Sequence, residues 1–425
     1  MGGAVPLRLF RLSSFRALWI GQLVSIFGDR FTYLALLALV VERASDPKNP
    51  APELAWIPIA SFLPAILFGP WIGALVDGWN TRATLLISDA FRGLLVLAII
   101  PAVEWHGLPA AFALVFLLYL VNAFFLPARS AILPDLVPRD SLVEANSLAT
   151  LAGILATIAG SFLAGALIDR SGWRIGFVLD AATYFVSVAA LAFIRIEPRA
   201  RPRPAGEPLR RYGALARDVR EGARIALASP RVLGSIGTVA LLWVAGGALH
   251  VSMPMVIARR GGSVISGLGA ALGCAAAGMV VGTLLLAWRG KTGSPQARIG
   301  VGLAGAGLAL LSFAALKNTA ALAAAAFVAG IFIAFLLVTT ESAIQESVGP
   351  EARARVFALR DFLARAGVLI SASILGLMLK RNWLTPAAAV GAAGAILLLG
   401  GICGGLRGLA GRKRAGRAGG AARDS

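Results

Sequence analysis

Twelve apolar stretches of about 20 residues dominate the sequence, and each has the length of an α-helix that crosses the hydrocarbon core of a bilayer. In the first half they lie at residues 15–41, 55–77, 83–103, 108–129, 146–168 and 174–195. In the second half they lie at residues 231–257, 264–287, 298–316, 320–345, 356–380 and 385–406. The sequence therefore predicts an all-α integral membrane protein with twelve transmembrane helices.

The composition and the placement of charge agree with this prediction. Apolar residues make up 58% of the chain and charged residues only 14%, whereas soluble proteins carry about a quarter. The net charge of +19 would suggest a nucleic-acid partner if it lay on one soluble face. Instead, Lys and Arg are about three times as frequent between the spans on one side as on the other, which marks the cytoplasmic side. We expect a multi-pass protein of the inner (plasma) membrane, with both termini cytoplasmic and no nucleic-acid partner.

The two halves of the chain repeat one another. Ser130-Ala-Ile followed by Pro138 recurs 212 residues later as Ser342-Ala-Ile followed by Pro350. Both copies close an even-numbered span, so we interpret the halves as duplicated, pseudo-symmetric six-helix bundles with a polar pathway between them. The predicted domains are an N-terminal bundle (1–195), a cytoplasmic linker with an amphipathic helix (196–230), a C-terminal bundle (231–406) and a basic cytoplasmic tail (407–425).

The linker begins with a stretch rich in Pro and Arg, residues 198–204, that cannot be helical. Beyond it, apolar residues spaced three and four apart from Leu209 to Ala226 predict an amphipathic helix. Such a helix either lies along the anionic cytoplasmic leaflet or packs against the helix bundle. A tether between the bundles and a lipid contact are compatible interpretations.

Several segments carry a family resemblance. Residues 73–82, with Gly73, Asp77 and Arg82, resemble the signature between spans two and three of the major facilitator superfamily. Residues 15–29, 125–139, 144–148 and 221–222 resemble the branch that contains the enterobactin exporter and macrolide efflux pumps. The resemblance covers almost the whole chain. It implies the major facilitator fold, transport by alternating access, and export of a drug, siderophore or other secondary metabolite.

Asp29 lies about 21 Å along a helix that would begin near Phe15, which puts it past the midplane of the first predicted span. Intramembrane acids are functional hypotheses by default, because an ionised carboxylate in lipid is costly unless it is paired or faces water. Reversible protonation of Asp29, beside Arg30, would suit proton coupling or substrate contact. The alternative is a structural role, either a partnership with Arg30 or a hydrogen bond between helices.

Arg129 and Glu341 occupy equivalent positions in the repeat, at the cytoplasmic ends of spans four and ten. In a facilitator-like bundle both spans line the cavity, and we interpret the two residues as a salt bridge that closes a cytoplasmic gate in one state. The alternative is that each is a separate interfacial charge.

The resemblance also implies a conformational latch. Gly73, Asp77 and Arg82 would approach the start of span eleven, where Arg355 and Arg360 meet an anion together with the positive end of a helix.

Other polar and aromatic residues complete the predicted site. Trp19, Tyr33 and Trp243 are candidate apolar cavity contacts, and His250 is either a cavity contact or a packing residue. Asp89 and Arg92, spaced i and i+3, are expected to form a structural pair on span three. Asp180 lies on span six, which is interpreted as a peripheral helix, and it is not expected to be the coupling site.

The predicted function follows from what is present and what is not. Two histidines and two cysteines, far apart in the chain, offer no metal site, and no catalytic constellation appears, so we expect no cofactor and no enzyme activity. The prediction is a monomeric secondary transporter that exports a small amphipathic molecule by proton antiport, in contact with membrane lipids. The alternative is transport of lysophospholipid or another lipid, and a membrane sensor or enzyme is disfavoured.

Overall fold

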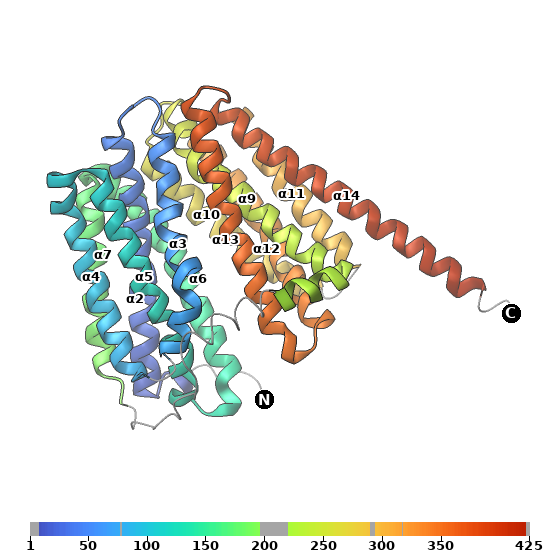
Figure 1. The fold of residues 1–425 in the computed structure, drawn as a ribbon, viewed down its shortest axis with the longest axis horizontal. Helices are drawn as coiled ribbons and strands as arrows, with labels where there is room; N and C mark the ends of the chain where they lie inside the picture. The colour runs from blue at the N-terminus through green and yellow to red at the C-terminus, as the bar shows by residue number, and fades with distance from the viewer. Residues whose placement is uncertain (1–7, 77–78, 196–219, 290–293, 317, 422–425) are drawn as a thin grey trace. The chain divides into compact units, whose positions relative to one another are not determined.

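The computed structural model describes residues 8–76, 79–195, 220–289, 294–316 and 318–421, and these are helical apart from short connections (Figure 1). Twelve of the helices are long and apolar enough to cross a membrane. The all-α, twelve-span prediction is therefore confirmed. Asp77 and most of the linker lie outside the described residues.

The helices fall into two compact units. The first unit holds Met1–Ala216 together with Ser263–Gly273, and the second holds Arg217–Gly262 and Cys274–Ser425. The helices of the first sequence half are α2 (Ser13–Arg43), α3 (Ala51–Val76), α4 (Thr81–His106), α5 (Leu108–Leu136), a 3-10 turn η1 (Arg139–Ser141), α6 (Leu142–Ser171) and α7 (Trp173–Ala192). Those of the second half are α9 (Pro230–Ala258), α10 (Val264–Arg289), α11 (Pro295–Ala315), α12 (Thr319–Ser347), α13 (Pro350–Lys380) and α14 (Pro386–Ala421).

Local sequence signals set the ends of several helices. The side chain of Asn80 accepts a hydrogen bond from the Ala83 amide at the start of α4, and Asn318 caps α12 in the same way. Gly107 and Gly172, at φ of 70° and 79°, are the single residues that join α4 to α5 and α6 to α7. A positive φ is easily adopted only by glycine, so these residues permit very short connections.

In the first unit, α2 packs against both α6 and α7, while α4 packs against α5 and α7. One end of this unit has an apolar core in which Phe15, Leu85 and Phe125 are buried. These contacts hold α2, α4, α5, α6 and α7 together around a polar interior that is described below.

In the second unit, α9 packs against α13 and α14, and α11 packs against α12 and α14. Part of α10 crosses α12 at small residues: a Cβ atom added at Gly282 would lie 2.5 Å from the carbonyl oxygen of Ile331. The Gly278 and Gly282 spacing thus permits the close helix approach typical of membrane proteins.

The described end of the linker, residues 220–228, is helical and packs on the second unit. Glu221 forms an ion pair with Arg355 of α13 at 2.8 Å, and a Cβ atom on Gly222 would lie 2.9 Å from the Arg355 carbonyl oxygen. Ala226 is buried beside Val356. Of the two placements predicted for the amphipathic helix, this end adopts the one against the bundle.

Candidate functional site

Asp29 lies near the middle of α2, about 24 Å from Ser13 at 1.5 Å per residue. Its Oδ1 accepts a hydrogen bond of 2.6 Å from the hydroxyl of Tyr184 on α7. The carboxylate is therefore held between helices by a neutral donor. The predicted hydrogen bond between helices is present, and its donor is Tyr184.

Arg30 points to a different helix from its neighbour. A Cβ atom on Gly160 of α6 would lie 3.0 Å from Arg30 Cγ, so the arginine stem packs where α2 crosses α6. Its Nε is buried and has no hydrogen-bond partner among the described residues. Tyr33 and Tyr119 lie within its electrostatic reach. Asp29 thus contacts α7 and Arg30 contacts α6.

Asp180 on α7 lies beside Asp29 and is fully buried. Thr183 donates to the Asp180 carbonyl at 2.7 Å, and its hydroxyl also lies 3.2 Å from Asp180 Oδ1. The Asp180 carboxylate lies against the α2 backbone at Gly28, the residue before Asp29. Two carboxylates thus approach one another inside the bundle, and like charges in such a site cannot both ionise cheaply.

The close approach of α2 and α7 depends on Gly28. A Cβ atom at this position would overlap Thr183 Oγ1 and Asp180 Oδ1, and would lie 2.9 Å from Thr183 Cβ. The absence of a side chain at Gly28 therefore places the Asp180 carboxylate against the α2 backbone, one residue from Asp29.

Asp89 and Arg92 on α4 form the predicted ion pair, and their side chains are 0% and 3% exposed. The Ser187 hydroxyl donates to Asp89 Oδ2 at 2.6 Å, and Arg92 Nη1 donates to Asn122 Oδ1 at 3.1 Å. The Arg92 guanidinium also stacks over Tyr184, 4.6 Å from the ring centroid. A buried charge of each sign is thus compensated within this pair, as buried ions require.

These contacts make one polar network that joins α2, α4, α5 and α7. Tyr184 connects its two parts, because its hydroxyl binds Asp29 while its ring lies under Arg92. The sequence placed Asp180 on a peripheral helix and did not favour it as the coupling site; the structure buries its side chain against α2. The signal was present in the sequence: Asp180, Thr183, Tyr184 and Ser187 are spaced so that they share one face of a helix.

A cavity of about 250 Å³ lies in the first unit between α2, α5 and α6. It brings together two residues that the sequence singled out separately, Trp19 and Arg129, and adds Gln22 and Asn146. The Trp19 indole donates to the Leu148 carbonyl at 3.0 Å, which fixes the ring at the edge of this cavity. An aromatic ring, a cation and two amides therefore share one space.

The other predicted contacts lie in the second unit. Trp243 and His250 are on α9, where Trp243 is 41% exposed, and Glu341 is exposed on α12. Arg129 and Glu341 belong to different units, and their gate remains a prediction.

The members of the predicted latch have the following partners. Arg82 donates to the Ala192 carbonyl at 2.7 Å, and Arg355 pairs with Glu221. Arg360 pairs with Asp361 at 2.8 Å. Gly73 lies within α3. The latch as a whole remains a prediction.

Comparison with known proteins places this chain in a family. The sequence profile of the Major Facilitator Superfamily matches residues 18–316. The chain is 26% identical over 305 residues to y4rN of Sinorhizobium fredii, an uncharacterized MFS-type transporter, covering 70% of this chain and 71% of that protein. It is 26% identical over 232 residues to the lysophospholipid transporter LplT of Cronobacter sakazakii, covering 54% of each chain.

Solved structures share the fold at low identity. The nucleoside transporter NupG aligns with a TM-score of 0.72 and 12% identity, covering 93% of this chain and 99% of that chain. A bacterial homolog of the human lysosomal transporter Spinster aligns with a TM-score of 0.66 and 16% identity, covering 96% and 95%. With twelve spans, the matching profile and these shared folds, the protein is a multi-pass membrane transporter that belongs to the Major Facilitator Superfamily.

Proposed function

We propose that this protein is a secondary active transporter that exports a small amphipathic molecule from the cytoplasm, driven by inward movement of protons. The observation that carries the proposal is the carboxylate pair of Asp29 and Asp180 inside the first bundle. Asp89 is neutralised by Arg92, whereas Asp29 accepts a hydrogen bond from the hydroxyl of Tyr184 and Asp180 accepts one from that of Thr183. A proton shared by this pair lowers the cost of holding two acids in a low dielectric.

The half-buried position of Asp29 supports exchange of that proton. Asp180 is fully buried, while Asp29 retains some exposure. Protonation of the pair would remove one negative charge, and its release would restore it. The two states differ in electrostatic energy, so proton binding can bias a conformational equilibrium.

The cavity beside Trp19 and Arg129 supports an amphipathic substrate. A ring for apolar contact, amides for hydrogen bonds and one cation suit a molecule with an apolar body and a polar or anionic group. The sequence resemblance to the enterobactin exporter and macrolide efflux pumps supports the outward direction. The predicted gate, with Arg129 in this cavity and Glu341 on α12, belongs to the same proposal.

Transport of lysophospholipid is the second candidate. Its support is the similarity to LplT proteins, at 26% identity for the Cronobacter sakazakii protein and 29% for that of Salmonella typhimurium, over about half of the chain. A lysophospholipid also combines an apolar chain with a polar headgroup.

Inverted membrane vesicles with an imposed pH gradient test the proposal. Candidate amphipathic dyes, a catecholate siderophore and a fluorescent lysophospholipid are offered in parallel to wild type, Asp29→Asn, Asp180→Asn and the control Asp140→Asn. Asp140 is an exposed acid in the turn η1, so its loss should change nothing. Both network variants should lose gradient-driven accumulation and keep substrate exchange at equal pH. Full gradient-driven transport by both variants would refute the coupling role, and gradient-independent transport of lysophospholipid alone would favour the second candidate.

A further inference from the structure

The two acids of the carboxylate pair differ in the hydrogen bonds that their oxygens receive. Asp29 Oδ1 accepts from the Tyr184 hydroxyl at 2.6 Å, and the Asp29 side chain retains some exposure. Asp180 is 0% exposed, and its Oδ2 has no hydrogen-bond partner among the described residues. An ionised carboxyl group requires donors or water at its oxygens, so these two acids are unequally prepared to carry a negative charge.

The other oxygen of Asp180 meets only a shared donor. The Thr183 hydroxyl has one proton, and it lies 2.7 Å from the Asp180 backbone carbonyl oxygen but 3.2 Å from Oδ1, so the shorter contact takes the larger share. Thr32 lies one turn beyond Gly28 on the same face of α2, yet its hydroxyl has no partner in the described part of the chain. A protonated Asp180, in contrast, can itself donate to a lone pair of the Thr183 hydroxyl oxygen.

Tyr184 is held where it serves Asp29. Its ring lies under the Arg92 guanidinium, 4.6 Å from the ring centroid, and Arg92 is itself fixed by its ion pair with Asp89. A cation over the ring draws electron density from the phenol, which makes its hydroxyl a stronger donor. Asp29 therefore has a fixed, strong donor that stabilises its ionised form.

The charges that face Asp180 come from the helices that pack against α7. Helix α4 contributes Asp89 and Arg92, which compensate one another, and α2 contributes Asp29. A negative charge on Asp180 would be repelled by an ionised Asp29, which follows directly after its contact point at Gly28. The ionisable residues of α6 lie toward its two ends and are Glu144, Asp169 and Arg170.

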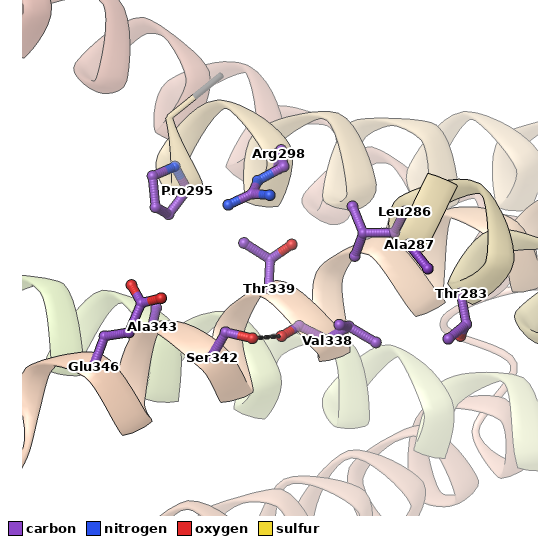
Figure 2. Close-up of a pocket in the computed structure, with 10 residues that line it drawn as sticks. All are labelled: Thr283, Leu286, Ala287, Pro295, Arg298, Val338, Thr339, Ser342, Ala343 and Glu346. Carbon is purple, nitrogen blue, oxygen red and sulfur yellow. Dashed lines mark hydrogen bonds between the residues drawn. The ribbon is translucent and has the colours of Figure 1, made fainter. Parts of the chain in front are cut away.

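A carboxylate of the second unit shows the opposite arrangement. Glu346 lines a cavity of about 310 Å³ between α10, α11 and α12, which Arg298 also enters (Figure 2). Glu346 is exposed, and a cavity of this volume has room for water. Water and a nearby cation both favour the ionised form of an acid. Glu346 is therefore a suitable control for Asp180.

We propose that Asp180 holds the exchangeable proton of the carboxylate pair, that Asp29 is its ionised member, and that Tyr184 is the positioning residue that fixes this assignment. The consequence for transport rests on the proton coupling proposed above. On release, the O–H bond of Asp180 breaks, the proton passes to water, and the carboxylate keeps the electron pair. Since the closed contact of α7 with α2 offers the resulting charge so few donors, release requires a state in which water reaches Asp180.

Infrared spectroscopy of the full-length protein in lipid bilayers locates the proton, because a protonated carboxyl group has a C=O stretching band that a carboxylate lacks. At neutral pH, wild type should show this band, Asp180→Asn should lose it and Asp29→Asn should retain it. Glu346→Gln and Asp140→Asn, which remove exposed acids, should leave it unchanged. Absence of the band from wild type, or its loss in Asp29→Asn with retention in Asp180→Asn, would overturn the assignment.

Tyr184→Phe tests the positioning role, since it removes the donor and keeps the ring under Arg92. Asp29 should then take part of the proton, and a second carboxyl band should appear that the additional change Asp29→Asn removes. Tyr119→Phe, in α5 of the same unit, is the control and should give the wild-type spectrum. A wild-type spectrum for Tyr184→Phe would overturn the positioning role.

If Asp180→Asn does not fold, Thr183→Val carries the test. Loss of the hydroxyl beside Asp180 Oδ1 should shift the frequency of the carboxyl band, and an unshifted band would overturn the assignment. The infrared measurement needs neither substrate nor a pH gradient. Failure of this assignment is therefore distinguishable from failure of proton coupling, which the vesicle assay measures.

Discussion

Replacing Gly28 with alanine should separate α2 from α7 and thereby disturb the carboxylate pair. The new Cβ atom would lie 2.9 Å from Thr183 Cβ and would overlap Thr183 Oγ1 and Asp180 Oδ1. Ordinary carbon contacts are about 3.5–4.0 Å, so one helix must move or both side chains must leave their positions. Overpacking of this kind costs about 1–3 kcal/mol.

Helix propensity stabilises the alanine variant, so this gain must be separated from the overpacking cost in the measured free energy of unfolding. Glycine in a helix interior is less favourable than alanine by about 1 kcal/mol. Gly237 of α9 is the matched control, because a Cβ atom added there meets nothing within 4 Å. Gly237→Ala should therefore show the propensity gain alone, and Gly28→Ala should be less stable than Gly237→Ala by about 1–3 kcal/mol.

Reversible unfolding in mixed detergent and SDS micelles, followed by tryptophan fluorescence, measures this difference. Thr183→Ala removes one overlapping atom, so the double variant with Gly28→Ala should recover part of the loss. Proton-driven transport should fall in Gly28→Ala, because Tyr184 and Asp180 move away from Asp29. Equal stability of Gly28→Ala and the control, with no coupling to Thr183→Ala, would refute the close contact of α2 with α7.

Three further predictions follow from the packing and the charges. Asp89→Asn or Arg92→Gln alone should destabilise the protein by about 3–5 kcal/mol in the same unfolding assay, because each leaves a buried charge unpaired, and the double variant should be closer to wild type. Gly282→Val should cost more stability than Gly237→Val, since its side chain meets the α12 backbone; equal losses would contradict the α10 and α12 crossing. Arg129→Glu and Glu341→Arg should each impair transport in vesicles, and the double charge swap should restore it if the two residues form the predicted gate; no restoration would count against the pair.

The number and lengths of the spans could be predicted from the sequence because every span must cross the hydrocarbon core of the bilayer with about 20 apolar residues. Helix ends were less predictable. The span predicted at 146–168 belongs to α6, which begins at Leu142, and the final helix α14 runs to Ala421, beyond the predicted end of its span at residue 406. Hydropathy measures which residues cross the hydrocarbon, whereas backbone hydrogen bonds continue a helix beyond it.

Site residues could be predicted where a charged residue interrupts an apolar span. They could not be predicted where the contact depends on which face a helix turns toward its neighbour. Asp29 stands out because an acid in the middle of an apolar span is rare. The burial of Asp180 against α2 was not predictable, because it depends on the face that α7 turns toward α2, and a stripe of small polar residues is compatible with several orientations. The donor that binds Asp29, Tyr184, lies 155 residues away in the chain, a pairing that local periodicity does not reveal.

The buried ions of the first bundle also bear on how the protein enters the membrane. The described residues that are both charged and buried are Asp89, Arg92 and Asp180, and all lie in the first unit. Asp89 and Arg92 can pair within α4 as soon as that helix is made. Asp180, however, would enter the bilayer at a cost of about 2.5–3.5 kcal/mol if α7 inserted alone in the ionised form. Synthesis of α7 should therefore be followed by docking onto α2.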